Sequence, residues 1–128
     1  MRSLARESVF KYIFSRLFNP SDEGLFAVLC KDLNDDDKSF ATELLNAIDK
    51  KESEYLDRIN EMGSVSSACK LHRTDMCALM LGMAELDNFP QTPVPVVIDE
   101  TVNLVAKYST ESSTDFVNGV LAEYAKEK

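Results

Sequence analysis

The chain has 128 residues, 45% of them hydrophobic, and a formal net charge of -8 at pH 7. This length and composition suit one compact domain with a hydrophobic core and exclude a disordered or disulfide-stapled peptide. No run approaches the ~20 consecutive apolar residues that cross a bilayer, and the sequence does not begin with a signal-peptide core. We therefore expect a single cytoplasmic domain over residues 1–128 that makes no membrane contact.

Helix signals cover the first half of the chain. The helices predicted there span about 3–18, 21–32, 35–50 and 52–62. Ser3 is placed to cap the first of them, and Asn34 or Asp35 is placed to cap the third, because short polar side chains accept hydrogen bonds from the free backbone N–H groups of a first turn. Their apolar residues recur at the helical spacing, so each helix should bury one face.

A polar break at Gly63 and "SVSSACK" separates an N-terminal half, about 1–62, from a C-terminal half, about 63–128. After it, "LHRTDMCALMLGMAELDNF" is apolar nearly all round, which predicts a central, buried helix. Two more helices are expected at about 96–108 and 113–126. The sequence therefore predicts an all-α protein of about seven helices in two packed helical subdomains.

The last predicted helix contains "TDFVNGVL", in which Asn-Gly is a strong hairpin signal. The apolar residues Phe116, Val117, Val120 and Leu121 nevertheless keep the helical spacing, whereas a turn would divide them between two faces. We predict a helix, with Gly119 present because another helix approaches it closely.

Sequence patterns for catalysis or metal binding are missing. The four glycines stand far apart, which argues against a phosphate-binding loop. His72 is the only histidine, and Cys30, Cys69 and Cys77 form no C-x-x-C pair, so we expect reduced thiols and no zinc site. The sequence predicts neither an enzyme nor a cofactor.

The first predicted helix has two unusual features. Residues 1–16 carry four cations against one carboxylate, a local net charge of +3 on an acidic chain, which favours either an anionic partner or an ordinary solvated face. Phe10, Phe14 and Phe18 also form an apolar stripe separate from the main one. Either the helix is buried on both sides, or some of these rings are exposed and bind a partner.

The segments "ARESVF", "HRTDMCALMLGMAEL", "PVPVVIDETVNLVAKY" and "STESSTDFVNGVL" resemble, in sequence and order, the NusB family of transcription antitermination factors. The resemblance covers the whole chain and is strongest over 73–121. It implies seven helices in two subdomains and no catalysis. It also implies pairing with NusE, a small-subunit ribosomal protein, and binding of the heterodimer to boxA RNA in the RNA polymerase antitermination complex on ribosomal RNA operons.

The resemblance also implies which residues bind each partner. Those expected at RNA are Arg2, Arg6, Lys70, Arg73, Tyr108 and Ser112. Those expected at the protein partner are Phe10, Phe14 and Asp75, with Phe14 the preferred exposed ring. Aromatic rings and polar side chains near residue 108 suit the stacking and hydrogen bonding by which single-stranded RNA is read. The alternative for Tyr108 is a core residue at a helix end.

Two other functions stay open. This chain has Ser3 and Leu4 where the family often has arginines, so one alternative is a protein-protein adaptor or homodimer with weakened RNA binding. A NusB-like domain also begins certain ribosomal RNA cytosine methyltransferases, but these need a cofactor domain for which 128 residues leave no room.

Overall fold

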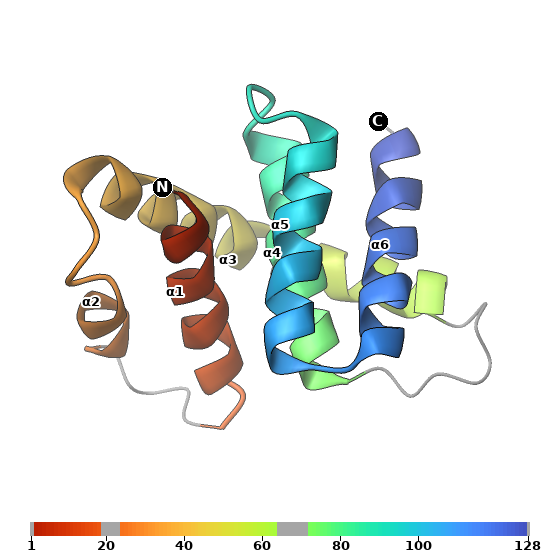
Figure 1. Ribbon diagram of the computed structural model, residues 1–128, viewed down its shortest axis with the longest axis horizontal. Coiled ribbons are helices and arrows are strands. Elements are labelled where there is room, and N and C mark those ends of the chain that lie inside the picture. Colours follow the sequence, from red (N-terminus) through yellow and green to blue (C-terminus); the bar gives the residue numbers. More distant parts are fainter. Residues whose placement is uncertain (1, 19–23, 64–71, 128) are drawn as a thin grey trace.

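The structure is a computed structural model that describes residues 2–18, 24–63 and 72–127, and every regular element in these ranges is a helix (Figure 1). The helices are α1 (Arg2–Ser15), α2 (Leu25–Leu29), α3 (Asp35–Gly63), α4 (Arg73–Asn88), α5 (Val94–Tyr108) and α6 (Glu111–Lys126). Within α3, Lys51 has non-helical dihedrals (φ -127°, ψ 21°), so a kink there joins the two helices predicted separately. The all-α class is confirmed, with six helices in place of about seven.

The helix boundaries follow their capping groups. Asn34 Oδ1 accepts a hydrogen bond from the backbone N–H of Asp37 at 2.8 Å, so the predicted cap of α3 is confirmed. Ser3 does not have its predicted position, because α1 already includes Arg2. The Ser3 hydroxyl instead donates to Glu100 Oε1 on α5 at 2.9 Å.

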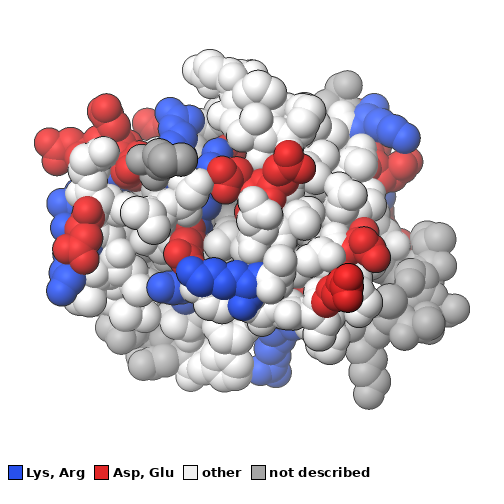
Figure 2. All heavy atoms as spheres, viewed as in Figure 1, with Lys and Arg blue, Asp and Glu red and all other residues white. Residues whose placement is uncertain are grey.

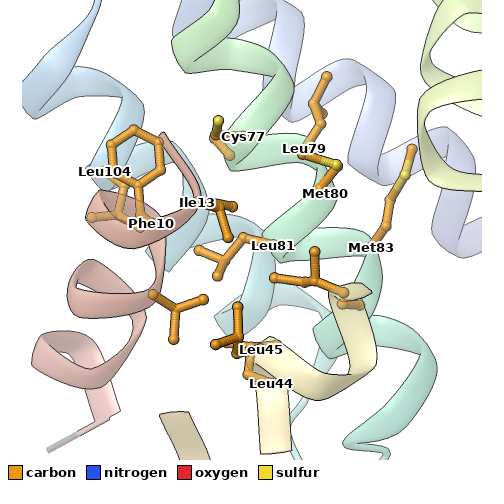
Figure 3. Close-up of a cluster of buried hydrophobic side chains, with 14 of the residues drawn as sticks. Phe10, Ile13, Leu44, Leu45, Cys77, Leu79, Met80, Leu81, Met83 and Leu104 are labelled. Atoms are coloured by element: carbon orange, nitrogen blue, oxygen red, sulfur yellow. The ribbon is translucent and has the colours of Figure 1, made fainter. Parts of the chain in front are cut away.

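Helix α4 is central, as its apolar sequence predicted. It packs against α1 and α3 on one side and against α5 and α6 on the other (Figure 1). Apolar side chains from four helices meet around it, including Phe10 of α1, Leu44 of α3, Leu81 of α4 and Leu104 of α5 (Figure 3). This continuous core fixes α1 and α5 relative to each other, and the candidate site lies along these two helices.

The segment "TDFVNGVL" lies within α6, so the helical prediction is confirmed, but the reason given for its glycine is wrong. Gly119 is exposed, and a Cβ atom there would meet nothing within 4 Å. The close approach occurs at Gly82 of α4, where a Cβ would lie 2.9 Å from both Leu121 δ carbons and 3.2 Å from Thr101 Oγ1. The tightly packed glycine is therefore the one in the central helix.

These two glycines should respond oppositely to alanine. We expect Gly119→Ala to raise the free energy of unfolding by about 0.5–1 kcal/mol, because alanine is the better helix former and the position is open. Gly82→Ala should lower it by about 1 kcal/mol, because displacing the buried Leu121 outweighs the gain in helix propensity. Urea unfolding of both variants tests this, and equal gains would contradict the assigned packing.

Candidate nucleic-acid interface

Arg6 lies inside the protein. Its Nε donates to Glu85 Oε1 at 2.7 Å and its Nη2 to Glu85 Oε2 at 2.6 Å, while Nη1 lies 3.9 Å from Glu100 Oε1. The side chains of Arg6 and Glu85 are only 4% and 0% exposed. The two-bond geometry matches the planar guanidinium to the planar carboxylate. The structure therefore gives Arg6 a structural role between α1 and α4, and its RNA contact stays a prediction.

A second N-terminal arginine forms an ion pair that is partly exposed. Arg16 Nη1 lies 2.8 Å from Asp49 Oδ1 of α3, so two of the four cations in residues 1–16 form ion pairs with the rest of the chain. Arg2 is exposed, with its guanidinium carbon 4.4 Å from the centre of the Phe40 ring, and Lys11 is exposed as well. Figure 2 accordingly shows basic and acidic side chains intermingled over this face.

A carboxylate of α1 holds two groups from the end of α5. Lys107 Nζ lies 2.5 Å from Glu7 Oε2, and the Tyr108 hydroxyl donates to the same oxygen. The Tyr108 ring centre is 5.3 Å from that of Phe10. Partial burial alone would raise the pKa of Glu7, but the hydrogen bonds from Lys107 and Tyr108 outweigh it and lower that pKa, so the carboxylate is anionic at neutral pH.

Sequence analysis did not select Lys107, although it lies within the family-like "AKY" segment beside Tyr108. Its side chain is 60% exposed, so its ammonium group remains accessible to solvent while it contacts Glu7. Tyr108 is 37% exposed and its ring packs against Phe10, so its RNA contact and the alternative of a core residue at a helix end both stay predictions.

Asp75, predicted at the protein partner, is buried and only 3% exposed. Its Oδ2 accepts from the Ser113 hydroxyl at 2.9 Å and its Oδ1 from the Ser109 hydroxyl at 3.3 Å. Because Ser109 lies in the short link between α5 and α6 and Ser113 lies in the first turn of α6, this carboxylate fixes the link against the start of α4. Ser112, predicted at RNA, lies exposed beside this network.

The aromatic stripe of α1 passes from core to surface. Phe10 is 3% exposed, Phe14 is half-buried between the rings on either side, and Phe18 is 62% exposed. The most exposed ring is therefore Phe18, not the preferred Phe14. The guanidinium carbon of Arg73, at the start of α4, lies 5.4 Å from the Phe18 ring centre. Lys70 lies outside the described residues.

Four members of the predicted RNA set are exposed, and they come from four helices: Arg2 of α1, Arg73 of α4, Tyr108 of α5 and Ser112 of α6. Helices α1 and α5 run in the same direction, since Ser3 near the start of α1 contacts Glu100 in the middle of α5, and Phe10 further along α1 contacts Tyr108 at the end of α5. A shallow groove of about 140 Å³ separates them near Ser3 and Lys107. Arg2 and Arg73 lie toward opposite ends of α1, whose 14 residues span roughly 20 Å. This length suits an extended chain better than a compact ligand.

The described residues form neither a metal-binding group nor a membrane-spanning helix. Across residues 2–18, 24–63 and 72–127, no three His, Cys, Asp or Glu side chains come together in a group that could hold a metal ion. In the same ranges, no helix has the length and apolar character needed to cross a membrane.

Cys30 and Cys77 are buried free thiols. Burial raises the pKa of the Cys77 thiol to about 12, so Cys77 is a poor nucleophile at neutral pH.

The fold and the site together define an all-helical domain in which α1 and the end of α5 present basic and aromatic groups beside carboxylates. The chain belongs to the NusB family, whose sequence profile matches residues 2–126. It is 32% identical over 127 residues to the transcription antitermination protein NusB of Koribacter versatilis, covering 98% of this chain and 86% of that protein.

Solved structures agree with the sequence comparison. A crystal form of T. maritima NusB superimposes with a TM-score of 0.85 at 27% identity, over 99% of this chain and 92% of that one. A chain in a crystal structure of the antitermination factors NusB and NusE in complex with dsRNA superimposes with a TM-score of 0.82 at 29% identity, over 99% and 97%. The family resemblance seen in the sequence is thus confirmed.

Proposed function

We propose that this protein is a non-catalytic transcription antitermination factor of the cytoplasm, which pairs with NusE and, with it, binds boxA-type RNA of ribosomal RNA operons. The observation that carries the proposal is the match over 99% of the chain to a structure that contains NusB, NusE and RNA. Membership of the NusB family over residues 2–126 supports it independently.

The described residues support a division of roles within this function. The exposed residues Arg2, Arg73, Tyr108 and Ser112 are the proposed RNA contacts. Phe14 and Phe18 are the proposed apolar contacts at the end of α1 for the protein partner. Because the chain is acidic overall and two of its N-terminal arginines form internal ion pairs, its own affinity for RNA should be weak. A basic ribosomal partner supplies the missing cations.

A titration of labelled boxA RNA at two salt concentrations tests the function. We expect weak binding by the protein alone and a clear gain when NusE is added. The variant Arg2→Gln should weaken binding by the complex and reduce the log-log salt slope by about 0.7, the value for one lost phosphate contact on single-stranded RNA. Lys50→Gln, an exposed position on α3, is the matched control. Absence of a NusE-dependent gain would favour the adaptor or homodimer.

A further inference from the structure

Glu7 occupies a position that an RNA phosphate could take. Its Oε2 receives both the Lys107 ammonium group and the Tyr108 hydroxyl, which are the donors that proteins commonly offer to phosphate oxygens. We propose that Lys107 and Tyr108 form a phosphodiester-binding subsite for single-stranded RNA, which Glu7 fills in the free protein and yields to a backbone phosphate on binding. This inference rests on the proposed function and assigns Glu7 a competing role.

The geometry supports exchange of one anion for another. The Tyr108 ring is held against Phe10, so its hydroxyl is already positioned before any ligand arrives. Lys107 is 60% exposed, whereas Glu7 is only 14% exposed, so the donors face solvent and the carboxylate lies beneath them. A phosphate can therefore approach Lys107 and Tyr108 from outside without displacing the core.

Charges of both signs surround the subsite, since Glu100 lines the same groove as Glu7 and Lys107, beside Arg6. Lys11, one helical turn after Glu7 on α1, also favours the charged form of Glu7 and lowers its pKa, after the larger effects of burial and the Lys107 and Tyr108 hydrogen bonds. Without the Glu7 charge, Lys11 and Lys107 would both face an incoming phosphate. In the native protein the Glu7 carboxylate repels that phosphate. Glu7 therefore weakens RNA binding, although it also orders Lys107 and Tyr108, the two groups that bind the RNA.

A simpler role for Glu7 is to join α1 to α5 by a surface ion pair, an interaction that contributes little to stability when exposed. The two roles predict different results for RNA. A joining role predicts unchanged or weaker RNA binding when the charge is removed, because the donors would be less well ordered. A competing role predicts tighter binding.

The variant Glu7→Gln separates these roles, because glutamine keeps the shape and one acceptor oxygen but removes the charge. With NusE present, we expect Glu7→Gln to bind boxA RNA on the order of fivefold more tightly at low salt, as expected for removing one nearby like charge. Its salt slope should also become steeper, because Lys107 is free to contact a phosphate. Glu123→Gln, an exposed position on α6, is the control for the change in net charge.

Lys107→Gln completes the experiment. In the Glu7→Gln background it should abolish the gain in affinity, so the two substitutions should be strongly non-additive. If Glu7→Gln binds RNA no more tightly than Glu123→Gln while the wild-type complex binds well, the competing role is wrong and the proposed function stands. If the wild-type complex with NusE fails to bind boxA RNA, both proposals are overturned.

Discussion

The variant Glu85→Ala is expected to lower the free energy of unfolding by about 3–5 kcal/mol, because it removes the carboxylate that accepts both hydrogen bonds of the buried Arg6 guanidinium, and Glu100, at 3.9 Å, is too far away to accept them. Arg6 is 4% exposed and lies between α1 and α4, where solvent cannot replace the two lost hydrogen bonds. Urea unfolding followed by circular dichroism measures the effect. A loss below about 1 kcal/mol would mean that water reaches the guanidinium in solution.

A double variant provides the control for Glu85→Ala. Arg6→Met combined with Glu85→Leu removes both charges and keeps apolar volume, so we expect a stability within about 1 kcal/mol of the wild type or above it. The buried ion pair also decides which variant should be used to test RNA binding.

Arg6→Ala would leave the Glu85 carboxylate buried and unpaired, and a loss of RNA binding in this variant would then report a damaged fold. Arg2 is the better position for testing the N-terminal contact.

The second large effect is expected at Asp75. Asp75→Ala removes the acceptor for the Ser109 and Ser113 hydroxyls and should cost about 1–3 kcal/mol of unfolding free energy. It should also loosen the link between α5 and α6, so RNA binding by the complex with NusE should fall even under conditions where the variant is fully folded. Asp115→Ala, an exposed acidic position on α6, should change stability by no more than about 0.5 kcal/mol.

Asp75→Asn distinguishes loss of the hydrogen bonds from loss of the charge. Asparagine keeps one carbonyl oxygen, which can still accept from Ser113, so we expect it to restore about half of the lost stability. Full RNA binding by a destabilised Asp75→Ala complex would contradict the positioning role. In that case the link between α5 and α6 would be ordered by other contacts.

Local sequence rules predicted the helices well because helices are local structures. Apolar spacing and the Asn34 cap gave the class and most boundaries, and the apolar character of "MCALMLGM" placed α4 at the centre. The partner of a charged residue is a different matter. Arg6 and Glu85 are 79 positions apart, so no local pattern around Arg6 shows that its charge is neutralised. The available signal was Glu85 itself, a carboxylate placed between the apolar residues Ala84 and Leu86 of the central helix.

The site was predicted in part for the same reason. The N-terminal cations cluster in the sequence, whereas Lys107 is brought beside Glu7 of α1 only by the fold. The unusual sequence context of Gly119 in "FVNGVL" predicted close packing there. The closely packed glycine is instead Gly82, whose neighbours Leu121 and Thr101 come from two other helices. Which positions face each other across helices is decided by the whole fold.

The partners of α1 have a consequence for how this protein is made. Its side chains contact residues far along the chain: Ser3 meets Glu100 across 97 positions, and Glu7 meets Lys107 across 100. During synthesis the first helix therefore leaves the ribosome long before α4 and α5 exist to cover it. Helices α2 and α3, against which α1 also packs, are made directly after it, but the Phe10 ring gains its contact with Tyr108 only when most of the chain has been made. Helix α1 should therefore complete its packing late.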